Sequence, residues 1–364
     1  MKAGIVGLPN VGKSTLFNCL SNAKAQSANF PFCTIEPNIG VVNVPDPRIN
    51  KLEELVKPER VQMATVDIVD IAGLVKGASK GEGLGNQFLG NIRECNAIIH
   101  VLRCFDNDNI VHVDGNVNPI RDKETIDIEL QLKDLETVEK RLEKTNRAAK
   151  TGNKEAQAEK ALLDRVRATL LEAKSARTVV PQNADEVVMM EEFQLITNKP
   201  VLYVCNVDES SAVNGNAYVE QVKELVKDEN AEVIILSVGA EADITELESY
   251  EERQVFLEDM GLTEPGSAVL IRAAYKLLNL QTYFTAGVKE VRAWTINVGS
   301  TAPQAAGVIH TDFEKGFIRA EVIAYDDYVA FETEAKVKEA GKLKVEGKEY
   351  IVKDGDVMHF RFNV

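Results

Sequence analysis

Residues 7–14 read GLPNVGKS, which has the G-x-x-x-x-G-K-S spacing of a phosphate-binding P-loop. Glycines in this motif let the backbone curl so that successive N–H groups point at an anion, and the next helix adds its N-terminal partial charge. Lys13 would reach the β- and γ-phosphates, and the Ser14 hydroxyl would bind Mg²⁺. An apolar run before the motif and helical spacing after it supply the strand–loop–helix context. We therefore prefer a nucleoside triphosphate site to a chance match in a glycine-rich turn.

A D-x-x-G sequence at residues 70–73 follows an apolar run and predicts the second part of the phosphate site. Asp70 would hold a water on Mg²⁺, and the Gly73 N–H would meet the γ-phosphate. Asp67 is the alternative acid, but no glycine follows it at the required spacing. Thr34 lies in a loop between two prolines and could complete the metal shell, unless it is an ordinary loop threonine. The predicted Mg²⁺ ligands are thus Ser14, Thr34 and Asp70.

The predicted base-reading segment is NVDE at residues 206–209, after an apolar run typical of a buried strand. In the guanine-specific pattern N-K-x-D, the lysine position is here Val207 and the aspartate position is Glu209. Aspartate accepts two guanine hydrogen bonds, and losing one bidentate match gives up ~1–3 kcal/mol of discrimination. The segment therefore favours ATP over GTP. Two alternatives stay open: Asp208 or Glu209 could replace the missing aspartate, or the tetrad is an ordinary surface turn.

A strand pattern at residues 233–236 precedes Ser-Val-Gly-Ala at 237–240, which predicts a loop of small residues packed on the purine edge. Together these motifs define the candidate nucleotide-binding residues. They are Asn10, Val11, Gly12, Lys13, Ser14, Thr15, Asn206, Val207, Glu209, Ser237, Val238 and Gly239.

Leu74 stands where many GTPases carry the glutamine that orients the attacking water. A missing catalytic group of this class can be worth ~10³–10⁵ in rate, so another group must act or turnover must be slow. Asn10 could hold K⁺, although a turn residue with an unusual backbone conformation is the alternative. His112 could swing toward the γ-phosphate, or it could be a solvent-facing loop histidine. The candidate catalytic residues are Lys13, Gly73 and His112.

With these motifs in order, the chain resembles the Obg-like ATPases of the YchF subfamily, within the TRAFAC P-loop GTPases. The resemblance covers essentially the whole chain, and four segments carry it. They are GLPNVGKST at 7–15, DIAGL at 70–74, GEGLGNQFL at 81–89 and NVDE at 206–209. It implies Mg²⁺-dependent ATP hydrolysis, adenine contact by Val207, use of the loop histidine His112, and association with the large ribosomal subunit or ribosomal RNA. The glycine-rich stretch 77–85 predicts an order–disorder switch. A GTPase with a relaxed base site and a nucleotide-gated binding module with negligible turnover remain the alternatives.

At 364 residues the chain is long for a single hydrophobic core and suits two or three units. Its net charge of −15 repels nucleic acid, so an RNA partner would need local basic patches or ribosomal proteins as intermediaries. Five cysteines without a C-x-x-C pair indicate reduced thiols in a cytosol. A strand pattern directly after Met1 predicts no signal peptide, and no apolar run approaches a membrane span. We expect a cytoplasmic monomer with no membrane contact.

Residues 1–125 and 190–275 carry the nucleotide motifs, and a different composition fills residues 126–189. Two amphipathic helical patterns, at 127–150 and 154–175, flank a break at 151–153 and predict an inserted antiparallel coiled-coil hairpin. We favour an arm that docks on a larger assembly over a lid packed on the core. The expected apolar positions are Ile128, Leu132, Leu135, Val138, Leu142, Leu163, Val166, Leu170 and Ala173.

Residues 280–364 alternate in strand fashion at 291–296 and 318–323, with a short helix expected at 301–310. Closing strands are expected at 350–352 and 357–362, around a tight turn. This is a small β-grasp-like domain, similar to the TGS domain of the same family, and it implies an RNA partner by analogy. His310 and His359 could contact RNA or occupy structural positions. The predicted fold is therefore an α/β P-loop NTPase domain with a mixed sheet, an inserted helical hairpin and a C-terminal TGS-like domain.

Overall fold

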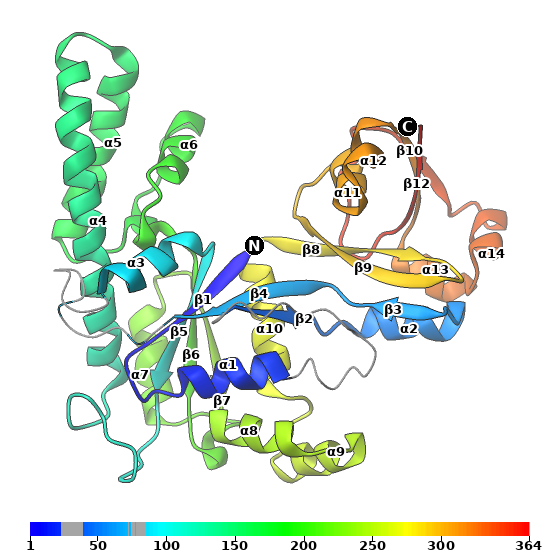
Figure 1. Cartoon of the computed structure of the whole chain (residues 1–364), viewed down its shortest axis with the longest axis horizontal. Helices are drawn as coiled ribbons and strands as arrows, with labels where there is room; N and C mark the ends of the chain where they lie inside the picture. The colour runs from blue at the N-terminus through cyan, green and yellow to red at the C-terminus, as the bar shows by residue number, and fades with distance from the viewer. Residues whose placement is uncertain (23–38, 72, 74–76, 78–84, 364) are drawn as a thin grey trace. The chain divides into compact units, whose positions relative to one another are not determined.

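The computed structural model describes residues 1–22, 39–71, 73, 77 and 85–363 (Figure 1). The predicted Mg²⁺ ligand Thr34, the residue Leu74 and most of the glycine-rich stretch lie outside the described residues. The chain divides into two compact units, Met1–Gly40 with Asp67–Ala274 and Val41–Val66 with Tyr275–Val364. The sequence did not indicate that Val41–Val66 belongs with the C-terminal unit.

The first unit is built on a six-stranded sheet of order β2-β4-β1-β5-β6-β7. Strand β1 is parallel to β4 and β5, and β5, β6 and β7 are parallel to one another. Because parallel strands end at the same edge, the segments after β1, β4, β5, β6 and β7 gather there. The strands are β1 Lys2–Val6, β2 Ile39–Asn43, β4 Thr65–Asp70, β5 Ala97–Arg103, β6 Val201–Asn206 and β7 Glu232–Leu236.

Central strands β5 and β6 are buried along their whole length, as near-continuous apolar runs predict for a sheet covered on both faces. His100, in the middle of β5, is buried with 2% exposure. Helices follow the strands in the alternating order of an α/β domain. They are α1 Lys13–Asn22, α3 Gly85–Glu94, α7 Ala217–Val226, α8 Val238–Glu246, α9 Tyr250–Asp259 and α10 Gly266–Leu277.

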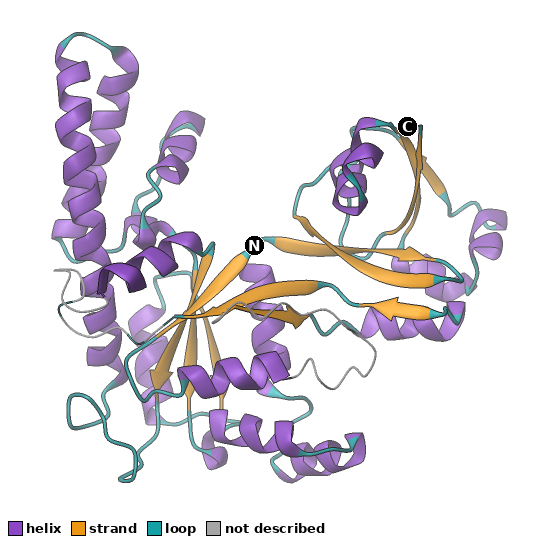
Figure 2. Cartoon of the chain, viewed as in Figure 1, coloured by secondary structure: helices purple, strands orange, loops and turns teal. Residues whose placement is uncertain are grey.

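A helical hairpin is inserted between β5 and β6, which confirms the prediction. Helices α4, Pro119–Lys150, and α5, Lys154–Leu171, run side by side (Figure 2). Asn118 and Asn153 cap their N-termini through side-chain oxygens. Helix α4 begins well before the predicted start at residue 127, so its first turns lie at the nucleotide edge of the sheet. Shorter helices follow, η2 Ala176–Thr178, α6 Ala184–Glu192 and η3 Ile196–Asn198.

The apolar seam between α4 and α5 is shorter than predicted. Val138, Leu142, Leu162, Leu163, Val166 and Leu170 are buried in one cluster, with Leu135 packed against it. Ile128 and Leu132 are instead 48% and 44% exposed, because at this level α4 buries a different face, which carries Ile126, Leu130 and Gln131. Ala173 lies beyond the end of α5 with a φ of +54°, so the predicted second helix is too long.

The second unit contains a mixed sheet of order β11-β10-β12-β8-β9-β3. Edge strand β3 comes from Val41–Val66 and pairs in parallel with β9. The predicted strand at 350–352 is wrong, because only an isolated bridge joins Ile351 to Thr301. The strands are β3 Arg60–Gln62, β8 Leu280–Ala286, β9 Glu290–Asn297, β10 Phe317–Ile323, β11 Lys344–Glu346 and β12 Val357–Phe362.

The core of this unit is aromatic, with Tyr283, Trp294, Phe317 and Phe360 buried around α11. The helices are α2 Pro47–Val56, α11 Ala302–Ile309, α12 Thr311–Lys315, α13 Tyr325–Phe331 and α14 Glu334–Glu339. His359 lies exposed on β12, and His310 caps α12. In the described parts of both units, no helix has the length and apolar character needed to span a membrane.

Candidate functional site

The P-loop connects β1 to α1 and approaches the neighbouring strand ends closely. Asn10 has a φ of +62° and Gly12 a φ of +99°, so both turn residues adopt the left-handed region. A Cβ on Gly12 would lie 2.6 Å from Asn206 Nδ2. A Cβ on Gly7 would lie 2.7 Å from the Val101 carbonyl oxygen. Space therefore requires both glycines of the motif, and Gly12 is required by its backbone conformation as well.

Lys13 is buried, and its Nζ donates a hydrogen bond to the Leu8 carbonyl at 2.9 Å. Burial lowers the pKa of Lys13, and the nearby Asp70 charge only partly opposes this effect. A Cβ on Gly73 would lie 3.2 Å from Nζ, which places the glycine of the D-x-x-G motif against the lysine. A polyphosphate bound here would stabilise the positive charge of the buried Lys13 ammonium group.

Two of the predicted Mg²⁺ ligands meet in the structure. The Ser14 hydroxyl, on the exposed first turn of α1 beside Thr15, donates to Asp70 Oδ2 at 3.1 Å. The other oxygen, Asp70 Oδ1, is buried without a hydrogen-bond partner in the described part of the chain. Burial raises the pKa of Asp70, against the opposing effects of Ser14 and Lys13. A carboxylate oxygen without a partner beside a hydroxyl is a fitting donor set for a hard cation such as Mg²⁺.

Asn206 ties the P-loop to the start of α8. Its Nδ2 donates to the Val11 carbonyl at 2.9 Å, and its Oδ1 accepts from the Val238 N–H at 3.0 Å. The side chain is 4% exposed, so both bonds are shielded from water. The asparagine predicted to read the base thus holds two segments of the site together.

The remaining base-site residues differ in exposure. Val207 is 2% exposed, and its N–H donates to the Leu236 carbonyl. Asp208 caps the short helix η4, Glu209–Ser211, and hydrogen bonding to Ser210 is the main cause that lowers its pKa. The Glu209 carboxylate is exposed and has no hydrogen-bond partner among the described side chains. Of the two acids that could replace the missing aspartate, Glu209 is the one not used in a local cap.

Residues 237–240 form the first turn of α8 and not the predicted loop. Ser237 is the N-cap, and its hydroxyl accepts from the Ala240 N–H at 3.3 Å. Ser237 and Val238 are buried, whereas Gly239 is exposed. A capping serine after a strand starts a helix here, which the small residue types concealed.

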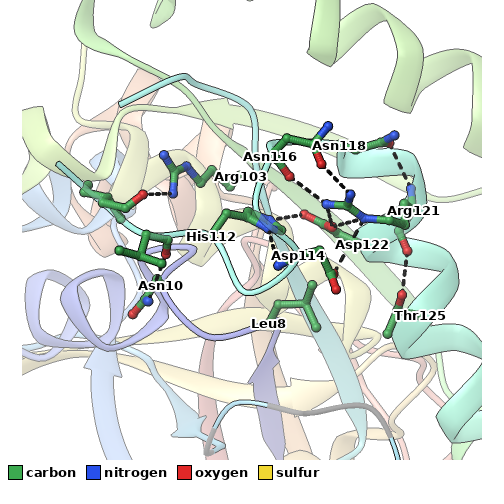
Figure 3. A network of polar contacts seen from close by, with 12 residues as sticks. Leu8, Asn10, Arg103, His112, Asp114, Asn116, Asn118, Arg121, Asp122 and Thr125 are labelled. Carbon is green, nitrogen blue, oxygen red and sulfur yellow. Dashed lines mark hydrogen bonds and ion pairs between the residues drawn. The ribbon is translucent and has the colours of Figure 1, made fainter. Parts of the chain in front are cut away.

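His112 lies in the loop between β5 and α4, and it is buried with 6% exposure. The predicted alternative of a solvent-facing histidine is therefore wrong. Its Nε2 lies 2.8 Å from Asp122 Oδ2 in the first turn of α4, and its Nδ1 accepts from the Asp114 N–H at 3.1 Å (Figure 3). The same loop contacts the P-loop, because Asn10 Nδ2 donates to the Val111 carbonyl at 3.1 Å.

The buried side chain of Arg103 hydrogen-bonds the backbone of the same loop. This residue was not identified from the sequence. The side chain is 1% exposed, at the end of β5. Its guanidinium donates to three loop carbonyls, those of Phe105, Asn107 and Ile110, at 3.0–3.2 Å. An arginine at the end of a largely apolar, buried strand was the available signal, because a buried guanidinium must find acceptors.

Comparisons with known proteins give the family. Residues 2–140 match a family model described as 50S ribosome-binding GTPase, and residues 280–363 match the YchF GTPase C-terminal model, described as a protein of unknown function. The ribosome-binding ATPase YchF of Haemophilus ducreyi is 58% identical over 363 residues, covering 100% of this chain and 99% of the relative. This chain belongs to the YchF family.

Other members of the family agree with this assignment in sequence and in structure. The ribosome-binding ATPase YchF of Bacillus subtilis is 53% identical over 366 residues, with complete coverage of both chains. The solved structure of the Schizosaccharomyces pombe YchF GTPase is 40% identical, with a TM-score of 0.90 over 99% of this chain and 97% of that one. The predicted resemblance and fold class are confirmed.

Proposed function

We propose that this protein is a Mg²⁺-dependent ATPase that binds the ribosome under control of its nucleotide state. The observation that carries the proposal is the meeting of Lys13, Ser14, Asp70 and Gly73 at one sheet edge. Relatives that cover the whole chain are named ribosome-binding ATPases, which supports both the reaction and the partner.

The described residues fit the phosphate chemistry as follows. P-loop amides and Lys13 would bind the polyphosphate, and the Gly73 N–H would meet its terminal group, which the closeness of Gly73 to Lys13 supports. Ser14 and Asp70 would hold Mg²⁺, which when bound neutralises charge that develops on the phosphate oxygens. We assign K⁺ to the Asn10 amide oxygen, because the amide nitrogen is already used by Val111.

Base choice is assigned to Glu209 and to the backbone beside it. Asn206 is occupied by two internal hydrogen bonds, and the Val207 side chain is almost fully buried. An exposed glutamate in place of aspartate favours adenine, so ATP is the proposed substrate and GTP the weaker one.

Competition between ATP and GTP with Mg²⁺ present tests the substrate. A tenfold preference for GTP, about 1.4 kcal/mol, contradicts the adenine assignment. Phosphate release in K⁺, with and without ribosomes, tests turnover separately. Nucleotide binding with no release in either condition would favour the nucleotide-gated binding module.

Local charge on the arm supports a ribosomal RNA contact in this acidic chain. Residues 143–155 at the hairpin turn hold four basic and two acidic side chains. We call the four basic ones the tip cations. They are exposed and form no ion pair with described carboxylates: Lys144, Arg147, Lys150 and Lys154. Cations free of acidic partners can bind phosphates by counterion release, and a ribosomal partner would place the protein in the cytoplasm.

A further inference from the structure

Both ring nitrogens of His112 are engaged in this structure. Because Nδ1 accepts the Asp114 N–H, the ring proton is on Nε2, which donates it to Asp122. Figure 3 shows the ring directed at Asp122 on α4, with Asn10 of the P-loop on the other side. A histidine in this arrangement has no free nitrogen with which to orient a water.

The Asp122 carboxylate has a second partner, Arg121, besides the His112 ring. The carboxylate is 1% exposed, and it also accepts from Arg121 Nη2 at 3.1 Å and Nε at 3.3 Å. Arg121 in turn donates to the side chain and carbonyl of Asn116, both at 2.7 Å, and lies 3.6 Å from Asp114. When His112 leaves, Asp122 keeps its guanidinium partner, so no unpaired charge stays buried.

We propose that Asp122 is a positioning residue that restrains His112 on α4, so that turnover requires the ring to leave it. The proposal rests on the proposed ATPase function and on the prediction from the sequence that His112 takes the place of the missing glutamine. Helix α4 continues into the arm, and a partner that shifts α4 would loosen the restraint. On the same helix, two turns later, Glu129 Oε1 accepts from the Gly77 N–H at 2.7 Å. The base of the arm therefore contacts both the histidine loop and the segment after the D-x-x-G motif.

A cation site is the competing explanation for this cluster. Ligand atoms of His112, Asp114 and Asp122 all lie within 4.8 Å of one another. The Arg121 guanidinium, however, contacts both carboxylates, and its fixed positive charge opposes a metal ion at the same place.

The first test compares Asp122→Asn with Asp114→Asn in the full-length protein. Asp122→Asn keeps the shape but removes the charged acceptor, so we expect kcat without ribosomes to rise about fivefold with KM unchanged. Asp114→Asn is the matched control, because its side chain contacts Arg121 but only its backbone contacts His112. We expect its kcat to stay within about twofold. In a His112→Ala background the effect of Asp122→Asn should vanish. A kcat that is unchanged or lower in Asp122→Asn, or a rise that persists without His112, overturns the proposal.

The second test does not depend on hydrolysis. The chain has only four histidines, so ¹⁵N-histidine NMR of the intact protein can resolve the His112 ring. We expect an unprotonated Nδ1 and a protonated Nε2 in the wild type, a shifted signal in Asp122→Asn and no shift in Asp114→Asn. A protonated Nδ1 in the wild type, or a ring signal that shifts on addition of Zn²⁺, overturns the assignment. If His112→Ala hydrolyses ATP normally, the catalytic role of His112 fails, whereas the NMR result still decides whether Asp122 holds the ring.

Discussion

Replacement of Asn206 by alanine should destabilise the first unit more than any surface change, because one side chain satisfies two buried backbone groups. The substitution leaves the Val11 carbonyl and the Val238 N–H without partners in a site where Asn206 is 4% exposed. Each buried group that loses its partner costs about 1–3 kcal/mol, so the free energy of unfolding should fall by about 2–6 kcal/mol. The P-loop would also lose its link to α8, so ATP affinity should fall with it.

Urea denaturation followed by two probes checks this magnitude. Circular dichroism reports helices of both units, whereas fluorescence of the sole tryptophan, Trp294, reports the second unit. We expect the circular dichroism transition to move to lower urea, and Asn183→Ala provides a control that removes only an exposed helix cap, worth about 1 kcal/mol. A loss of unfolding free energy for Asn206→Ala no larger than for this control would show that the two buried hydrogen bonds contribute little to stability.

Three further predictions concern the phosphate site, the arm and a buried histidine. Lys13→Ala should reduce Mg²⁺–ATP affinity at least tenfold, about 1.4 kcal/mol, while Lys2→Ala should not; calorimetric titration measures both. Replacing the tip cations with alanine should weaken ribosome binding and lower its log–log salt slope by roughly 0.7–0.9 for each RNA phosphate that the arm no longer neutralises. The paired arm lysines Lys140 and Lys160 are the control, and an equal effect of replacing them would argue against an RNA contact at the tip. Burial lowers the pKa of His100 from its ordinary value of 6.5 to about 3 in the folded protein. Below pH 6.5 the unfolded chain therefore binds a proton at this histidine more readily than the folded protein does. Stability should therefore fall as the pH drops from about 6.5 toward 3, by up to about 1.4 kcal/mol per unit, and His100→Phe should flatten that part of the curve.

Local spacing was sufficient wherever a function depends on consecutive residues. The P-loop, the D-x-x-G motif and Asn206 were each predicted at the end of an apolar run, and the structure places each at a strand end. The hairpin was also predictable, because Asn153 and the break before it lie within one short segment. Contacts between distant residues were not predictable in this way. Ile128 was predicted to be a seam residue, but at this level α4 buries the face of Ile126 and Leu130 and leaves Ile128 exposed.

Residue types and their spacing were enough to predict the kind of chemistry, because they are typical of a phosphate-binding loop, a metal-binding acid and hydroxyl, and an altered base-reading tetrad. The contacts that hold the site together were visible only once the chain was folded. The contact of His112 with Asp122 and the tie from Asn206 to Val11 and Val238 join segments that come from different strands and helices. Such contacts depend on how elements pack, and burial of polar groups then requires partners that no local pattern names.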